Sequence, residues 1–503
     1  MSRKKVKPRA RAVQQAQWSN PRLASVLAGV VPFVIYLRTM APTVYGLDSA
    51  ELTTGAYVLG IVHAPGAPFY LLLAHAFTWL PIGDVGYRVN LLSACASALT
   101  ALLIYRIIHR LTNDVLLSLA TTWFLAFSYY FWVSAVAAEL YAVHGSFLAA
   151  LILLSLRWRD EGRAWQLYAI AFLFGLGLGN HMSLILAGPG LAWLVASVPS
   201  RPWRRPRLLA GVACYGLCGA AVYLYLPLRG LAQPPMNYAR DYGFDVTTWQ
   251  GFWAMITCRM FAPQLFAVPL FELPTALLRY LYWLWSNFLN LGVLFGILGL
   301  VSDWRRRPQV HLGLLLMFLL HVGFFITYRV VDVESMFVPT YIVFALWIAL
   351  GAQAVSRYLS RRFVGVSPVF GSLLVLCLSL TTLATNFSSA DLSNDRSARV
   401  IGEAIFKSVA RGSVYIGVWA DAPVLAYLQL VEHQRPDVRV VNLFFLGVAG
   451  GARIAEEQSR AGRVVYTSRP EFFDDGYERF DYIRACNCYR MRDDAVRDSS
   501  NAK

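Results

Sequence analysis

The sequence predicts an α-helical polytopic membrane protein of about eleven transmembrane helices, followed by a small extracytoplasmic α/β domain. The composition is the first observation: 57% of the 503 residues are hydrophobic and 15% are charged, which is too apolar for an ordinary soluble domain. The second is a series of apolar runs long enough to cross a bilayer, at about 20 residues each. The third is the uneven distribution of positive charge among the loops between these runs.

The excess positive charge lies in the membrane part of the chain. Residues 385–503 carry 16 basic and 16 acidic residues, whereas residues 1–384 carry 29 basic and 13 acidic residues, so the net charge of +16 arises there. Positive charge confined to short loops between apolar runs indicates topology and is not typical of nucleic-acid binding. We therefore expect the lipid bilayer, and no nucleic acid, as a partner.

The chain is expected to begin with a basic cytoplasmic tail, residues 1–20, followed by a transmembrane domain over residues 21–385. The first apolar run, residues 23–40, has no small-residue cleavage pattern after it, so we interpret it as a retained anchor. The further runs of spanning length lie at 87–109, 115–133, 139–157, 164–180, 182–198, 208–227, 277–301, 309–327, 337–355 and 365–384.

Residues 67–82 are apolar but short, with His75 inside the segment and proline near both ends. We expect a re-entrant or interfacial helix here rather than a transmembrane span.

Loop charges support this order of spans. With the N-terminus inside, the cytoplasmic loops and span ends collect 22 basic and 4 acidic residues, and the outer side of the membrane domain collects 7 basic and 9 acidic residues. A missed span near the middle would mix the two sets, so the separation favours this topology. Several polar residues are then expected at the outer face: Asp48, Glu51, His63, Glu139, His181, Arg229, Arg259, Asp332 and Glu334.

Residues 386–503 are expected to form the extracytoplasmic α/β domain. Three β-rich runs, "GSVYIGVWA", "DVRVVNLFF" and "RVVYTS", alternate with helical stretches. Strands that alternate with helices favour parallel βαβ units. Cys486-Asn-Cys488 is too weak a pattern to distinguish a metal site from a disulfide.

Asp48 and Glu51 are the first candidates for chemistry. In one interpretation Asp48-Ser-Ala-Glu51 is a capping box that starts a short helix. In the other, the two carboxylates lie at the membrane surface directly after a span, where apolar surroundings raise carboxyl pKa values and charged groups are usually functional.

Three further polar groups are predicted at the same face, each with a simpler structural interpretation. His63 opens a turn built by Pro65, Gly66 and Pro68, and it could be merely an exposed connector. Glu139 opens a predicted span, where it either needs a partner or extends to the interface. His181, after a glycine-rich segment, is either a titratable site residue or part of a hairpin tip.

The longest outer loop, residues 228–272, combines Arg229, Arg240 and Arg259 with aromatic residues and Asn237. This composition suits the binding of a phosphate and a sugar, although single arginines at an interface often contact lipid headgroups. Arg329, followed by Asp332 and Glu334, repeats the pattern before the tenth span. The sequence holds no Walker A, GxGxxG, HExxH or paired CxxC motif that would indicate ATP hydrolysis, dinucleotide redox chemistry or zinc proteolysis.

The run from Gly46 to Ala94 resembles a family related to eukaryotic protein O-mannosyltransferases, within the GT-C glycosyltransferase superfamily. The resemblance is carried by a D-S-x-E motif at Asp48–Glu51, an H-x-P-G-x-P turn at His63–Pro68 and a Y-R-x-N-L-x-S segment at Tyr87–Ser93. Ala67 departs from the aromatic residue common at that position. Further similar segments are "AELYAVHGSFLAALI", "GLGNHMSL", "YLPLRGLAQPPMNY", "DVESMFVPTY", "NDRSARV" and "LAYLQLVEHQRPDVRVVNL".

The resemblance implies a GT-C-like bundle that transfers a sugar, first of all mannose, from a polyprenyl-phosphate-linked donor to a hydroxyl group of a protein or glycan acceptor at the outer face. It implies Asp48 as catalytic base, with Glu51 as the close second, and inversion at the anomeric carbon. Arg229, Arg259, Arg329 and His181 would bind the departing phosphate. No metal is required by this scheme, although the carboxylates could hold Mg²⁺ or Mn²⁺.

The competing interpretation is a transporter, or a lipid- or glycan-binding membrane protein without catalysis. Transporters tend to have internal repeats and binding groups at mid-membrane, whereas the ionisable residues here gather at the outer ends of predicted spans. That distribution favours an interfacial enzyme. The arginine-rich chain suggests a bacterial inner (plasma) membrane as its location.

Overall fold

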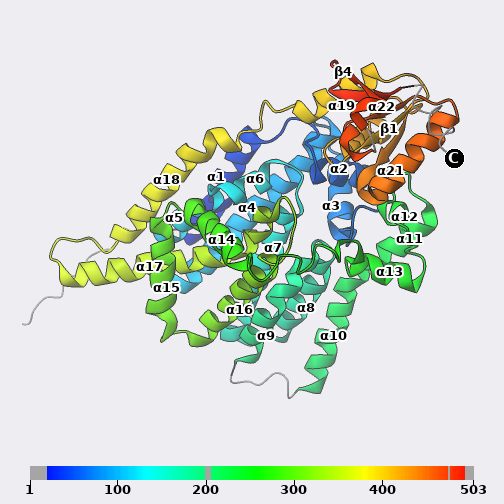
Figure 1. Ribbon diagram of the computed structural model, residues 1–503. Helices are drawn as coiled ribbons and strands as arrows, with labels where there is room; N and C mark the ends of the chain where they lie inside the picture. Colours follow the sequence, from blue (N-terminus) through cyan, green and yellow to red (C-terminus); the bar gives the residue numbers. More distant parts are fainter. Residues whose placement is uncertain (1–19, 199–204, 474–475, 493–503) are drawn as a thin grey trace, which may run out of the picture.

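The computed structural model describes residues 20–198, 205–473 and 476–492. A helical bundle is followed by a smaller unit with a five-stranded sheet, which lies over one end of the bundle beside α2 and α12 (Figure 1). The basic tail predicted for residues 1–20 lies outside the described residues, except for Asn20, which caps the first helix.

The first half of the bundle runs from α1 to α9. Its helices are α1 (Pro21–Thr39), α2 (Asp48–Val58), α3 (Pro68–Thr78), α4 (Val85–Thr112), α5 (Val115–Ala126), α6 (Tyr129–Val136), α7 (Leu140–Glu161), α8 (Ala164–Leu178), the 3₁₀ turn η1 (Met182–Ala187) and α9 (Gly188–Ala196).

The second half runs from α10 to α18. Its helices are α10 (Pro206–Ala220), η3 (Ala221–Leu224), α11 (Tyr225–Ala232), α12 (Tyr238–Asp241), α13 (Trp249–Ile256), η4 (Arg259–Phe261), α14 (Leu273–Asn287), α15 (Leu291–Trp304), α16 (Pro308–Phe325), η5 (Val333–Phe337), α17 (Val338–Arg362) and α18 (Phe370–Ala390).

Each of the eleven predicted spans coincides with a helix or a helix pair, but not all are straight spans. Among the described residues, seven helices are long and apolar enough to cross a membrane, and the bent pairs α5–α6 and α14–α15 raise the number to at most nine. The predicted spans 164–180 and 182–198 correspond to shorter apolar helices. The helices α14 and α15 are bent by 104° at Leu289 and Asn290, which both have positive φ. The sequence predicts one straight span here, because hydropathy detects an apolar run but not a bend within it.

The helices α7 and α17 form the centre of the bundle, with most of their residues buried. Close packing around them depends on small residues. A Cβ atom on Gly299 of α15 would lie 1.9 Å from the carbonyl oxygen of Trp347 in α17, and one on Gly351 of α17 would lie 1.9 Å from that of Phe295. Glycine at both positions therefore lets the two backbones approach closely. The predicted segment 67–82 contains the short helix α3, whose 11 residues are too few to span a bilayer.

The C-terminal unit is an α/β fold, as predicted. Its elements are α19 (Ser397–Ser408), β1 (Val414–Gly417), α20 (Ala422–Leu430), β2 (Arg439–Asn442), α21 (Leu443–Arg460), β3 (Val465–Thr467), η6 (Pro470–Phe472), α22 (Gly476–Arg479), β4 (Phe480–Ile483) and β5 (Cys488–Met491). The strand order is β2-β1-β3-β5-β4; the first three strands are parallel, and β5 runs antiparallel to both β3 and β4. A disulfide joins Cys486, in the turn after β4, to Cys488, the first residue of β5.

Successive side chains of β1 pack on opposite faces of the sheet. Tyr415 packs with residues of α19 and α20, and this cluster also includes Val44 and Ala50 of the membrane domain. Val414 and Ile416 pack on the other face with residues of α21. The first cluster therefore attaches the sheet unit to the start of α2.

Arg399 of α19 reinforces this attachment. Its guanidinium donates to both carboxylate oxygens of Glu432, over 2.6 and 2.7 Å, and lies 3.3 Å from Asp84 at the start of α4. The hydroxyl of Tyr427 also accepts a hydrogen bond from the backbone amide of Gly86 over 3.2 Å. A bidentate arginine–carboxylate pair fixes orientation as well as distance, so these contacts hold the C-terminal unit in one pose over α2.

Candidate active site

Asp48 is the first residue of α2, but it does not cap the helix. The N-cap is Leu47, with φ +56°, and it makes no side-chain cap hydrogen bond. The capping-box interpretation of Asp48 and Glu51 is therefore wrong, because both carboxylates are engaged elsewhere. A non-glycine residue with this backbone conformation is strained, and such strain is common beside functional sites.

Glu51 and His63 form a buried pair. One helical turn into α2, Glu51 is fully buried, and its Oε1 accepts a hydrogen bond from the backbone amide of His63 over 2.6 Å. Its Oε2 pairs with Nδ1 of the same histidine. The turn 63–68 thus folds back on α2, and both Glu51 oxygens are occupied by one residue.

The electrostatics of this pair keep a proton on it. Burial acts to lower the pKa of His63, but the neighbouring Glu51 charge, the hydrogen bond to it and the Asp48 charge outweigh burial and raise that pKa to about 9. Burial also raises the pKa of the Glu51 carboxyl; the His63 charge and its hydrogen bonds act to lower that pKa, and the Asp48 charge adds to the rise, so that the pKa stays above its ordinary value. At neutral pH the imidazolium is therefore the stable form beside the carboxylates.

Asp48 has a partner from the other end of the chain. Its Oδ1 accepts a hydrogen bond from the indole Nε1 of Trp419 over 2.7 Å. Trp419 follows β1, at the carboxyl end of a parallel strand, and such ends commonly line ligand sites in α/β folds. The C-terminal unit therefore contributes directly to the carboxylate site.

A short buried network fixes the loop that carries Trp419. Asp421 accepts hydrogen bonds from the hydroxyl of Tyr415, over 2.8 Å, and from the backbone amide of Val418, over 2.7 Å. A Cβ atom on Gly417 would lie 2.5 Å from the Asp421 carboxylate, so the turn needs glycine there. These contacts set the position of the indole ring before any ligand binds.

Aromatic rings from both units surround His63. Its imidazole lies edge-on to Trp419 and to Phe261, with ring centroids 5.7 and 5.9 Å apart. Trp419 also contacts Tyr238 of α12 and Phe444 of α21, at centroid distances of 6.0 and 4.8 Å. The carboxylates therefore lie beside an aromatic surface of the kind that stacks against sugar rings or apolar side chains.

Glu139 and Asp332 lie close enough to interact electrostatically with this cluster. Glu139 immediately precedes α7, and burial, followed by the charges of Asp48 and Asp332, raises the pKa of its carboxyl well above the ordinary value. Its backbone amide donates to Ser93 over 3.1 Å, and the amide of Ala138 donates to Ser49 over 3.2 Å. The predicted convergence of Asp48, Glu51, His63, Glu139 and Asp332 is thus present in the structure.

His181 belongs to a group of three histidines. Its ring contacts that of His144 at a centroid distance of 5.5 Å. Neither ring nitrogen of the buried His144, nor Nε2 of His321, has a hydrogen-bond partner among the described residues. Burial, followed by the nearby His63 charge, lowers the pKa of His181 to about 4. Since Nδ1 of His181 accepts the Ser183 amide, Nε2 carries the proton and can donate it.

The three predicted phosphate-binding arginines differ in the partners of their guanidinium groups. Arg229 donates to the carbonyl oxygens of Leu59 and Val58, over 2.6 and 3.3 Å, at the C-terminal end of α2. Arg329 is exposed and pairs with Glu272 over 2.9 Å. Arg259 is exposed and, within the described part of the chain, its guanidinium has neither an ion pair nor a hydrogen bond.

The two residues that follow Arg259 contact the turn that carries His63. Arg259 precedes Met260, whose sulfur accepts the backbone amide of Ala64, and Phe261, whose ring contacts His63. Of the three arginines, it is the one that combines a free guanidinium with an attachment to the His63 turn. Loop 228–272 therefore contributes to the site, through Arg259 rather than Arg229.

Asn237 caps a short helix, and its backbone pairs with a distant segment. The Asn237 side chain caps α12 by accepting the Arg240 amide over 3.1 Å, and the adjacent backbone bridges to Ile61. Glu334 lies in η5, two residues after Asp332. The structure gives Asn237 a positioning role, since its bridge holds loop 228–272 against the residues before His63.

Asp48, Glu51 and His63 could together hold a divalent cation. Each offers one ligand atom, and these atoms all lie within 4.8 Å of one another. Two carboxylates and one imidazole suit several divalent ions. An ion would, however, have to replace the Glu51–His63 hydrogen bond that already satisfies both side chains.

Two groups of residues were not anticipated from the sequence. Trp419 carried a usable signal, since it follows a predicted strand in "GVWAD". His144 and His321 gave little signal in the sequence, because a lone histidine in an apolar run is often structural. Only their meeting with His181 in space distinguishes them.

Comparisons with known proteins show which sequences this chain is similar to. Residues 48–203 match the family described as "Protein O-mannosyl-transferase TMEM260 N-terminal domain". Protein O-mannosyl-transferase TMEM260 of Mus musculus is 30% identical over 224 residues, which cover 43% of this chain and 31% of the relative. Its counterpart in Dictyostelium discoideum is 22% identical over 466 residues, covering 82% of this chain and 56% of the relative. The matches thus span about a third to just over half of these relatives.

The fold is similar to that of a solved structure. ArnT from Cupriavidus metallidurans, bound to undecaprenyl phosphate, superposes with a TM-score of 0.59 at 11% identity, covering 93% of this chain and 97% of that one. Its apo form gives a TM-score of 0.57 at 12% identity, with the same coverage. The bundle and the C-terminal unit therefore have the same overall fold as ArnT.

Proposed function

We propose, on the premise that this chain is related to the TMEM260 protein O-mannosyl-transferases and has a GT-C fold, that it is a membrane glycosyltransferase. It transfers a sugar, with mannose as the first candidate, from a polyprenyl-phosphate-linked donor to a hydroxyl group of a protein or glycan acceptor. The observation that carries the proposal is the Asp48 carboxylate, held by Trp419 beside the buried Glu51–His63 pair. The names of the relatives support mannose and protein as first candidates.

Asp48 is the better base of the two carboxylates. Both oxygens of Glu51 are bound by His63 and the side chain is fully buried. Asp48 is partly exposed, and Trp419 occupies only its Oδ1. The remaining oxygen can therefore accept a proton from an incoming hydroxyl group.

The reaction is a single displacement. The acceptor oxygen bonds to the anomeric carbon as its proton moves to Asp48, and the bond from that carbon to the phosphate oxygen of the donor breaks. The lipid phosphate leaves on the opposite face, so the anomeric configuration inverts. His63 remains protonated and partly offsets the negative charge of Asp48 and Glu51, which would otherwise repel the departing phosphate.

Arg259 and His181 are the groups we assign to the donor phosphate. Arg259 supplies an unpaired guanidinium, which favours phosphate geometry, and His181 supplies an Nε2–H donor in its neutral form. The short helix α3, with Leu72 and Trp79 exposed, gives an apolar surface beside which the polyprenyl chain can enter sideways. The undecaprenyl phosphate bound to ArnT supports a donor of this chemical class.

The loop charges support an outer-face reaction, with a cytoplasmic N-terminus and an extracytoplasmic C-terminal domain over residues 386–503. We take a bacterial inner membrane as the first candidate compartment.

The function is tested by reconstitution of the full chain into liposomes with polyprenyl-phosphate mannose and Ser/Thr-containing acceptor peptides. Mass spectrometry should find acceptors heavier by one hexose, and NMR of the product should show an anomeric configuration opposite to that of the donor. Donor binding without any product across peptide, lipid and glycan acceptors would instead support a binding protein without catalysis.

A further inference from the structure

A second concave site lies at the far end of the bundle from Asp48. α17 starts next to η5, near the carboxylates, and its 25 residues extend about 37 Å at 1.5 Å per residue. At its other end, a cavity of about 370 Å³ opens between α15 and α17. It is lined by Ser302, Asp303, Arg306, Leu350, Gln353, Ala354, Arg357, Tyr358, Arg361 and Arg362.

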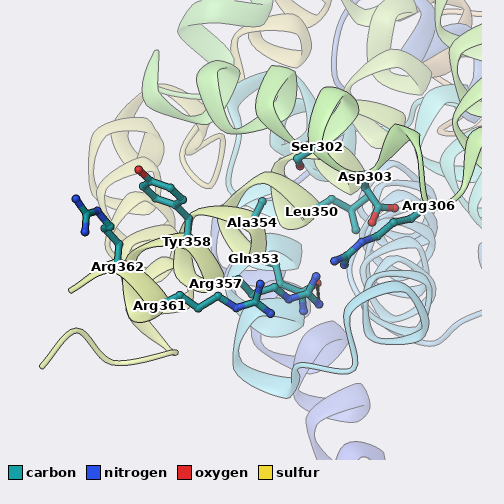
Figure 2. A pocket seen from close by; sticks show the side chains of 10 residues that line it. All are labelled: Ser302, Asp303, Arg306, Leu350, Gln353, Ala354, Arg357, Tyr358, Arg361 and Arg362. Carbon is teal, nitrogen blue, oxygen red and sulfur yellow. Dashed lines mark hydrogen bonds between the residues drawn. The ribbon is translucent and has the colours of Figure 1, made fainter. Parts of the chain in front are cut away.

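Arginines from two separate segments meet in this cavity. In Figure 2, Arg306, just after α15, points toward Arg357, Arg361 and Gln353 of α17, whereas Arg362 and Tyr358 lie toward the opposite side of α17. We call Arg306, Arg357 and Arg361 the arginine triad. Guanidinium groups that face one another repel, so a shared anion would stabilise this arrangement.

The protein itself supplies little negative charge to the triad. Asp303 is the one acidic residue that lines the cavity, and it already pairs with Arg307, over 3.4 Å, and with His311, over 3.2 Å. Arg357 donates to the neutral Gln353 over 2.6 Å. Across residues 20–198, 205–473 and 476–492, the structure shows no ion pair for any member of the triad.

The surroundings of the cavity are those of a lipid site rather than of a soluble ligand site. Leu350 and Ala354 form an apolar part of its wall. Large apolar side chains next to it are exposed on the protein surface, including Val301 at 69% and Phe363 at 53%. Cations at the rim of an apolar surface match a phospholipid, whose headgroup carries the phosphate and whose acyl chains are apolar. Basic pockets between transmembrane helices commonly bind anionic headgroups.

We propose that the arginine triad binds the phosphate headgroup of one anionic phospholipid, whose acyl chains lie along the exposed apolar side chains of α15 and α17. The loop charges place this end of the bundle in the cytoplasmic leaflet, where anionic lipids are enriched in many membranes. The site is separate from the carboxylate site and does not depend on the proposed glycosyl transfer.

The test measures lipid binding to the full chain, purified in a neutral detergent. Native mass spectrometry is used to titrate a short-chain phosphatidylglycerol, with phosphatidylcholine and inorganic phosphate as separate arms. The triple variant Arg306→Gln/Arg357→Gln/Arg361→Gln removes the triad. A matched variant, Arg22→Gln/Arg207→Gln/Arg305→Gln, removes three exposed arginines from the same predicted side of the membrane, outside the cavity.

We expect saturable binding of phosphatidylglycerol to the wild type that weakens about tenfold or more in the triad variant and less than about twofold in the matched variant. Equal weakening in both variants, undiminished binding in the triad variant, or binding of inorganic phosphate as tight as that of the lipid would overturn the proposal. If the triple variant fails to fold, the single variant Arg361→Gln, at an exposed position in the last turn of α17, is measured with Arg305→Gln as its control.

Discussion

The indole N–H of Trp419 donates a hydrogen bond of 2.7 Å to Asp48, although 371 positions separate the two residues. This contact connects the carboxyl edge of the C-terminal sheet to the first residue of α2. The proposed catalytic base is therefore oriented by a different structural unit from the one that carries it.

Replacing Trp419 with phenylalanine keeps an aromatic ring and removes the N–H donor. Loss of a hydrogen bond to a charged group costs about 1.5–3 kcal/mol, so kcat should fall about 10- to 100-fold, while the KM for the lipid donor changes little. Steady-state kinetics of the reconstituted enzyme measure both quantities. Trp249→Phe, at an exposed tryptophan of α13, is the matched control, and an equal loss of activity there would argue against a specific role for Trp419.

The Glu51–His63 pair should make stability depend on pH in the alkaline range. The pKa of His63 is raised to about 9 from an ordinary value of 6.5, so the folded state binds the proton more tightly than the unfolded state. This stabilisation is complete below pH 6.5 and is lost as the pH rises through about 9. Thermal unfolding of the wild type should therefore shift to lower temperature between these values.

His63→Gln retains a hydrogen-bonding side chain but cannot titrate. Its unfolding temperature should be lower than that of the wild type at pH 6.5, and the difference should shrink toward pH 9 and above. A constant difference across this range would show that the charge of His63 does not stabilise the fold.

Arg259→Ala should weaken donor binding. The unpaired guanidinium is the cation we assign to the departing phosphate, and loss of a charge-assisted contact of about 1.5–3 kcal/mol raises the donor KM about 10- to 100-fold. Arg329→Ala removes an exposed arginine that pairs with Glu272 and should leave the donor KM nearly unchanged. If the donor KM rose in Arg329→Ala and not in Arg259→Ala, the result would show that Arg329 binds the donor phosphate instead.

Removal of divalent cations should not abolish transfer. Glu51 and His63 satisfy each other, and Trp419 orients Asp48, so the proposed displacement does not need an ion. The measurement is the initial rate before and after dialysis against EDTA. Inactivation that Mn²⁺ or Mg²⁺ reverses would show instead that Asp48, Glu51 and His63 bind a metal.

Much of the membrane domain follows from local patterns. Apolar runs located the long helices and helix pairs of the bundle, and strand-like runs located β1, β2 and β3, because both signals depend on neighbouring residues. The short helices α12 and α13, inside the predicted loop 228–272, were missed. The bend between α14 and α15 was missed, since two residues with positive φ leave the hydropathy unchanged. The β4–β5 hairpin was missed because Asp481 and Arg490 interrupt the apolar residues of its two short strands.

The candidate site was partly predictable for the same reason. The expected placement of charged residues at one face brought Asp48, Glu51, His63 and Glu139 together. The sequence does not reveal that Arg229 donates its hydrogen bonds to carbonyl groups at the end of α2, because its partners Val58 and Leu59 are about 170 positions away. Trp419 was missed because its contact depends on how the C-terminal unit docks, which Arg399 and Glu432 help to set.

The most direct test of the central claim compares single-turnover transfer by Asp48→Asn, Glu51→Gln and Asp245→Asn. Asp245, in loop 228–272, caps a turn through Thr247 and serves as the matched control. We expect Asp48→Asn to lower the rate by about 10²- to 10⁴-fold, the usual contribution of a general base, with donor binding retained and Asp245→Asn near the wild-type rate. Transfer at the wild-type rate by Asp48→Asn would contradict the account, and it would do so most clearly if Glu51→Gln were inactive while still folded.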